Sequence, residues 1–129
     1  MAKILITDDA AFMRGSLKYI VEGAGHSVVG VAKEGQEALE LTRELKPDIV
    51  TLDILMSGMD GISALEAIKK EASGTKVIMV TALGQEEKQE EAFKLGASGY
   101  IRKPFKQTEI VDEIKWVLGG ERRVRERRQ

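Results

Sequence analysis

Five polar residues follow or end short apolar segments of this chain: Asp8, Asp9, Asp53, Thr81 and Lys103. Asp8 and Asp9 are adjacent, and adjacent anions repel each other, more strongly when they are partly buried. A cation between them would remove this repulsion. Three carboxylates in a chain with one histidine and no cysteine suit a hard cation. Mg²⁺ fits best, because it accepts one or two carboxylates and keeps several waters.

A hydroxyl and an ammonium that face such a cation could bind the remaining oxygens of a phosphoryl group. Phosphoryl transfer depends chiefly on positioning and charge neutralisation. Asp53 is then a candidate nucleophile that would form an aspartyl-phosphate. Each residue alone has a more ordinary explanation: Asp8 could cap a helix, and Lys103 could be a solvated charge in a turn. The combination of residues carries the prediction.

The elements that must position these residues are short apolar strands alternating with segments of helical spacing. Strands are predicted at 3–7, 27–32, 48–53, 76–81 and 99–101, and helices at 10–23, 35–45, 62–72, 85–96 and 108–118. Strict alternation indicates a parallel sheet with helices on both faces and right-handed crossovers. The fold class is therefore a doubly wound α/β fold. Parallel strands bring their carboxyl ends to one edge of the sheet, where ligands bind.

Glycines follow three of the predicted helices, at positions 23, 74 and 96. A glycine at this place commonly adopts the left-handed conformation that ends a helix. We therefore expect left-handed helix stops at these three positions.

Length and composition bound the function classes. The 129 residues form one domain by the usual size prior and are enough for a real core. Without cysteine, disulfides, thiolate metal sites and a cysteine nucleophile are excluded. No apolar run approaches the roughly 18 residues of a membrane span. The first residues lack the pattern of a signal peptide, so we expect a cytoplasmic location.

Charge is unevenly distributed between the body and the end of the chain. The segment 119–129 holds five arginines and two glutamates, a charge of +3. Because the net charge of the whole chain is −1, residues 1–118 carry a charge of −4. An acidic body argues against direct nucleic-acid binding by that body. We expect residues 1–118 to form the domain and 119–129 to be a flexible basic tail or part of a linker.

Four segments resemble the signature segments of the receiver domains of two-component response regulators: LITDDA, DIVTLDILMSGMDG, VIMVTA and GYIRKPF. The resemblance covers about residues 2–118. DDAAFMR with PDIVTLDI is similar to the chemotaxis branch, which includes stand-alone CheY-like regulators and the receiver of the chemotaxis methylesterase. It implies a flavodoxin-like fold with five helices and a five-stranded sheet in the order 2-1-3-4-5.

The resemblance also implies which residues accept the phosphoryl group and bind the metal. Asp53 matches the phospho-accepting aspartate and a Mg²⁺ ligand. Asp9 matches a direct Mg²⁺ ligand, Asp8 a ligand that usually acts through water, and the backbone carbonyl of Leu55 the third protein ligand. Ser57 stands where the family commonly has proline, and this difference should loosen the loop after Asp53.

Further residues match the switch machinery of the family. Thr81 and Lys103 match the residues that hold the phosphoryl oxygens, and the Lys103–Pro104 bond is expected to be cis. Tyr100 matches the aromatic that swings inward when the threonine is drawn toward the phosphate. The implied function is a phosphorylation-activated signalling switch that receives its phosphoryl group from a histidine kinase. The resemblance places the binding face for a downstream protein at about residues 85–118.

Two other functions fit the sequence less well. A haloacid-dehalogenase-like phosphatase needs Asp-x-Asp after the first strand, whereas here the acids are adjacent and Ala10 is third. A flavodoxin-like flavin carrier needs a Ser/Thr-rich phosphate loop in place of DDAAFM. Apart from modifying its own aspartate, the protein is expected not to be an enzyme. The chain could instead be the receiver of a longer regulator whose output domain, a transcription factor or methylesterase, is absent.

Overall fold

The computed structural model describes residues 1–119, which form one parallel sheet enclosed by helices. The five strands are β1 (Lys3–Thr7), β2 (Ser27–Ala32), β3 (Ile49–Leu52), β4 (Lys76–Thr81) and β5 (Gly99–Arg102). The five helices are α1 (Ala11–Gly23), α2 (Gly35–Leu45), α3 (Gly61–Glu71), α4 (Glu86–Lys94) and α5 (Gln107–Gly119). The sheet order is β2-β1-β3-β4-β5, with every neighbouring pair parallel. The predicted fold class and strand order are confirmed.

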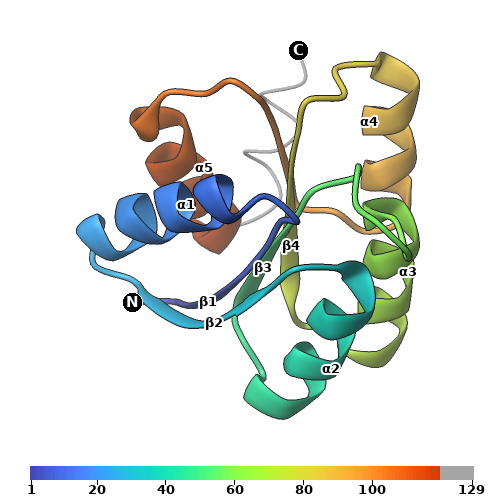
Figure 1. Cartoon of the computed structure of the whole chain (residues 1–129), viewed down its shortest axis with the longest axis horizontal. Helices are drawn as coiled ribbons and strands as arrows, with labels where there is room; N and C mark the ends of the chain where they lie inside the picture. Colours follow the sequence, from blue (N-terminus) through green and yellow to red (C-terminus); the bar gives the residue numbers. More distant parts are fainter. Residues whose placement is uncertain (120–129) are drawn as a thin grey trace.

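The helices divide between the two faces of the sheet, α1 and α5 on one and α2, α3 and α4 on the other (Figure 1). Alternation along β1 shows how the sequence fills both faces. Ile4 and Ile6 pack toward α1 and α5, with Leu17 and Ile114, whereas Leu5 packs in the core on the opposite face. These three residues of β1 are fully buried. Strands covered on both faces therefore show continuous apolar runs rather than polar alternation.

Two of the three predicted glycine stops are wrong. Gly96 has a φ of 108° after α4, as expected. After α1 the positive φ of 93° falls on Gly25, two residues beyond the predicted Gly23. No positive φ occurs at Gly74, and α2 ends in a left-handed Lys46 with a φ of 50°. A glycine after a predicted helix therefore does not by itself identify the residue that adopts the left-handed conformation.

Helix α4 is the most polar of the five helices. It carries the sequence EEKQEEAFK, and Ala92 is its one fully buried residue. Glu86 and Glu87 lie in its first turn, where their negative charges interact favourably with the positive end of the helix dipole. Within residues 1–119, the helices are all too short or too polar to cross a membrane.

Candidate functional site at the carboxyl edge of the sheet

The carboxyl edge of the sheet brings together most of the predicted site residues. Asp8 directly follows β1, Asp53 directly follows β3, and Thr81 ends β4. Lys103 directly follows β5. Three of these side chains are buried: Asp8 is 1% exposed, Asp53 6% and Thr81 0%. Buried polar groups need hydrogen-bond partners from side chains, backbone or ordered water.

Lys103 joins two of the predicted acids. Its Nζ lies 2.7 Å from Oδ2 of Asp8 and 2.7 Å from Oδ2 of Asp53. The second oxygen of each carboxylate accepts a backbone hydrogen bond, Oδ1 of Asp8 from the Ala10 amide at 2.9 Å and Oδ1 of Asp53 from the Leu55 amide at 3.1 Å. Both carboxylates are thus fixed in position, with one positive charge shared between two negative charges.

The electrostatics of Lys103 follow from this arrangement. Burial lowers the pKa of its ammonium group, but the hydrogen bonds and charges of Asp53 and Asp8 outweigh burial and raise the pKa above its ordinary value. The ammonium therefore stays charged throughout the physiological range. With Asp8 and Asp53 ionised, the three groups carry a net charge of −1, which leaves the site attractive to a further cation.

The oxygen donors at this edge are of the type that a hard divalent cation prefers, although the acids are not arranged as a complete set of metal ligands. Carboxylate and carbonyl oxygens are what Mg²⁺ prefers, and it needs few of them. Asp9 is exposed, and residues 1–119 contain no group of three His, Cys, Asp or Glu side chains positioned to hold a metal ion. In this arrangement the Lys103 ammonium provides the positive charge between Asp8 and Asp53. A metal ion would have to compete with it or bind beside it.

Thr81 and Tyr100 are linked through the loop that follows β4. The Leu83 amide donates a hydrogen bond to Oγ1 of Thr81 at 3.3 Å. The Tyr100 hydroxyl donates to the Leu83 carbonyl at 2.5 Å, and the tyrosine is 9% exposed. Its ring lies 6.5 Å from that of Phe93, centroid to centroid. The resemblance implied an aromatic that swings inward; Tyr100 is already buried, with its hydroxyl bound to the loop.

Burial is the main cause of a raised pKa at the Tyr100 phenol, and the negative charge of Asp53 adds to it. The positive charge of Arg102 acts in the opposite direction. The phenol therefore stays protonated and able to donate to the Leu83 carbonyl.

The loop after Asp53 brings in a residue that the sequence analysis missed. A Cβ on Gly61 would overlap the Asp53 carbonyl oxygen and would lie 2.6 Å from the Ile54 Cα atom. The first turn of α3 therefore packs directly on the backbone of Asp53. The Asp60 side chain caps this helix by accepting a hydrogen bond from the Ser63 amide at 2.8 Å. The signal in the sequence was the Asp-Gly pair before an apolar helix.

Two details of this edge bear on the loop conformation. The Lys103–Pro104 bond is cis, which confirms that prediction. Gly58, next to Ser57, has a φ of 73°, a conformation that favours glycine.

Leu55 is 54% exposed beside the site. It lines a groove between α3 and α4 whose apolar lining also includes Leu83.

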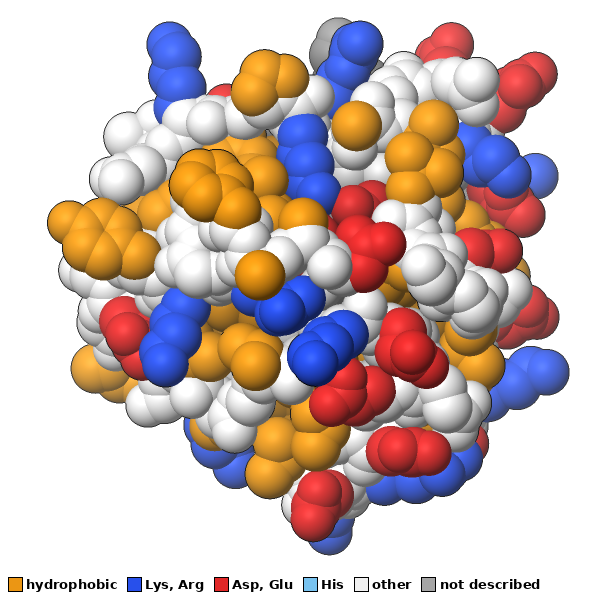
Figure 2. Space-filling model, in the orientation of Figure 1, with side chains coloured by type: hydrophobic (Ala, Val, Ile, Leu, Met, Phe, Trp, Pro, Cys, Tyr) orange, Lys and Arg blue, Asp and Glu red, His pale blue; other side chains and the backbone are white. Residues whose placement is uncertain are grey.

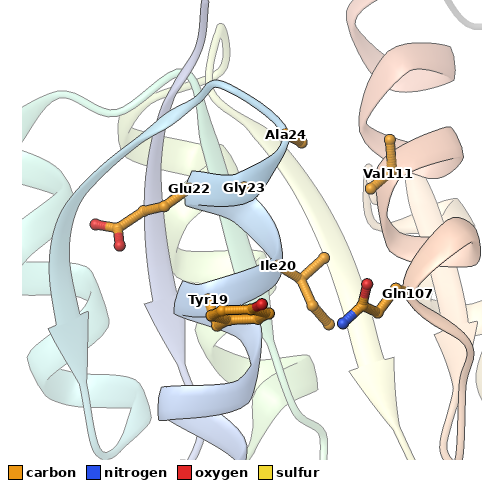
Figure 3. Close-up of a pocket in the computed structure, with 7 residues that line it drawn as sticks. All are labelled: Tyr19, Ile20, Glu22, Gly23, Ala24, Gln107 and Val111. Carbon is orange, nitrogen blue, oxygen red and sulfur yellow. The ribbon is translucent and has the colours of Figure 1, made fainter.

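A second surface feature lies away from these residues, between α1 and α5. This groove has a cavity volume of about 620 Å³, and Figure 3 shows Ile20, Gln107 and Val111 directed toward it. Figure 2 shows hydrophobic side chains exposed over α1. Two aromatics of this helix are largely exposed, Phe12 at 84% and Tyr19 at 73%. These aromatics could not be recognised as exposed from the sequence, because their spacing in a helix does not distinguish a core face from an exposed one.

Comparison with known proteins identifies the family of the chain. Residues 4–115 match the response regulator receiver domain family. Over 115 residues the chain is 47% identical to chemotaxis protein CheY of Thermotoga maritima, a match that covers 89% of this chain and 96% of that protein.

Solved structures of similar proteins have the same fold. CheY in a CheX-CheY-BeF3-Mg complex from Borrelia burgdorferi matches with a TM-score of 0.88 and 33% identity, covering 90% of this chain and 88% of that one. The response regulator domain of Thermotoga maritima CheB matches with a TM-score of 0.81 and 39% identity, covering 93% and 96%. The chain therefore belongs to the response regulator receiver domain family.

Proposed function

We propose that this protein is a phosphorylation-activated signalling switch of the chemotaxis type, with Asp53 as the phospho-acceptor. The observation that carries the proposal is the buried Asp53 carboxylate, which Lys103 contacts at 2.7 Å at the carboxyl edge of the sheet. The similarity to CheY proteins over almost the whole chain supports the chemotaxis assignment. The protein acts as a signalling component rather than as a catalyst of a metabolic reaction.

The chemistry is the transfer of one phosphoryl group. A carboxylate oxygen of Asp53 attacks the phosphorus atom of a phosphohistidine on the kinase. A P–O bond to Asp53 forms as the P–N bond breaks, and the histidine leaves with the electron pair of that bond. The Lys103 ammonium stabilises negative charge on the phosphoryl oxygens, and the Thr81 hydroxyl donates to one of them after leaving the Leu83 amide.

Asp8, Asp9, Asp53 and the Leu55 carbonyl are the proposed ligands of Mg²⁺. When bound, Mg²⁺ would supply positive charge that neutralises the phosphoryl group and the acids around it. The similar CheX-CheY-BeF3-Mg complex from Borrelia burgdorferi supports this choice of metal. Asp8 is already oriented by the Ala10 amide, whereas the exposed Asp9 would have to turn toward the metal.

The output is a change in a protein-binding surface. A phosphoryl group on Asp53 that draws the Thr81 hydroxyl away from the Leu83 amide would change the loop that Tyr100 contacts. This biases a two-state equilibrium at the 85–118 face, which carries α4, β5 and α5. A histidine kinase as donor and a downstream protein as target are the partners in this proposal, and the cytoplasm is the proposed location.

The proposed domain is residues 1–118. The basic tail proposed for 119–129 falls almost entirely outside the described residues. An attached transcription-factor or methylesterase domain would leave the chemistry at Asp53 unchanged and would alter only the output.

Intact-protein mass after incubation with acetyl phosphate and Mg²⁺ tests the proposal. We expect a gain of one phosphoryl unit in the unmodified protein and in Asp48→Asn. This control removes an aspartate at the opposite end of β3, where its carboxylate accepts a hydrogen bond from the Lys3 amide. Asp53→Asn and a sample treated with a chelator should show no gain. An adduct that persists in Asp53→Asn would refute the assignment of the acceptor.

A further inference from the structure

Arg102 makes an unusual contact with the loop after β4. It ends β5 and pairs in register with Thr81 on the neighbouring strand. A Cβ built on Gly84 would lie 2.5 Å from Cζ and 2.9 Å from Cδ of Arg102. The guanidinium group therefore lies directly against the Gly84 backbone, at a distance that any side chain at position 84 would prevent.

The backbone that Arg102 contacts is the backbone that binds the switch residues. The Leu83 carbonyl and the Gly84 amide nitrogen belong to one peptide group. That carbonyl accepts the Tyr100 hydroxyl, and the Leu83 amide donates to Thr81. One flat, charged side chain thus covers the segment on which Tyr100 and Thr81 both depend.

We propose that Arg102 is a positioning residue of the switch: its guanidinium group, lying on Gly84, holds the β4–α4 loop in the conformation that binds the inward Tyr100 hydroxyl. The planar guanidinium suits this role, because it packs flat against other planar groups and covers apolar surface with its stem. In the described part of the chain, no hydrogen bond or ion pair to another residue draws the Arg102 side chain away from the loop. Its importance for signalling rests on the proposed function, but its effect on Tyr100 does not.

The chain offers a direct readout, because it contains two tyrosines. Labelling with 3-fluorotyrosine gives two ¹⁹F resonances: Tyr100 reports the inward position, and Tyr19, which is 73% exposed on α1, is an internal reference. The variants are Arg102→Ala, Gly84→Ala and the double variant. Lys70→Ala, which removes an exposed positive charge on α3, is the matched control.

Arg102→Ala should move the Tyr100 resonance toward that of an exposed tyrosine. We expect a decrease of about twofold in the ratio of inward to outward Tyr100, the size of effect usual for an exposed side chain that makes no ion pair. Gly84→Ala should have the same effect, because the new methyl group displaces the guanidinium. Adding Gly84→Ala to Arg102→Ala should change nothing further, since the guanidinium is already absent. Tyr19 and the Lys70→Ala spectrum should stay unchanged.

A Tyr100 resonance that is the same in Arg102→Ala and in the unmodified protein would overturn the proposal. Equal, additive effects of Gly84→Ala in the presence and absence of Arg102 would also overturn it, because the glycine would then act through the backbone alone. These results are independent of phosphorylation. If the mass experiment shows no Asp53 adduct while Tyr100 still responds to Arg102, the proposed function fails and the role of Arg102 remains.

Discussion

Replacing Lys103 by methionine tests whether its ammonium group holds the two acids together. The change keeps the length of the side chain and removes the charge that Asp8 and Asp53 share. Both carboxylates are nearly inaccessible, at 1% and 8% side-chain exposure. Lys103→Met therefore leaves two buried anions that keep one backbone hydrogen bond each but have lost their shared cation. Breaking a buried ion pair in this way costs about 3–5 kcal/mol, and we expect the lower end because the Lys103 side chain is 16% exposed.

For a domain of this length, a loss of about 3 kcal/mol corresponds to a fall in melting temperature of roughly 10 °C. Thermal unfolding followed by circular dichroism measures this loss. Mg²⁺ in the millimolar range should raise the melting temperature of Lys103→Met more than that of the unmodified protein, because the metal no longer competes with the ammonium. Lys70→Met controls for the loss of an exposed lysine.

Two results would refute the reasoning. If Lys103→Met melts at the same temperature as Lys70→Met without Mg²⁺, the two contacts at 2.7 Å contribute nothing to stability. If Mg²⁺ stabilises Lys103→Met and the unmodified protein equally, the metal binds away from the ammonium.

Three further predictions concern residues around the site. Gly61→Ala should lower the free energy of unfolding by roughly 1–3 kcal/mol in urea titrations, because the new methyl group overlaps the Asp53 carbonyl. The same variant should also be labelled more slowly by acetyl phosphate, and an unchanged labelling rate would contradict this close packing. Asp60→Ala should cost about 1 kcal/mol by the same measurement, because the Ser63 amide loses its cap, whereas Asp60→Asn should restore most of it. Burial and, after it, the charge of Asp53 raise the pKa of the Tyr100 phenol in the folded protein. The stability that the protonated phenol contributes is therefore complete below pH about 10 and is lost as the pH rises through the higher pKa of the folded state. Urea midpoints should therefore fall less steeply above pH about 10 in Tyr100→Phe; parallel curves would argue against a buried phenol.

The position of the site could be predicted from the sequence because it depends on strand direction alone. Once the apolar segments were assigned to a parallel sheet, the residues that follow each strand had to lie at one edge, as Asp8, Asp53 and Lys103 do. The partners within that edge could not be predicted in the same way. A lysine side chain reaches several positions, and the sequence does not tell which acids its Nζ contacts.

The same limit applies to the switch and the helix ends. The inward Tyr100 depends on where the Leu83 carbonyl points, and this is set by a loop that Arg102 covers. The left-handed Lys46 lacks the glycine that usually marks such a stop. The contacts at Tyr100 join residues distant in sequence, so local patterns carry no signal for them.

The polar character of α4 has a consequence for how the molecule would respond to a small input. A helix with Ala92 as its one fully buried residue is attached to the sheet by little apolar surface, so it should open locally at a free energy well below that of global unfolding. Its amide protons should exchange with solvent earlier than those of α3, which buries five residues. A helix that buries so little apolar surface needs only a small change in free energy to be displaced. Events at a single carboxylate could therefore reach the molecular surface without disturbing the core.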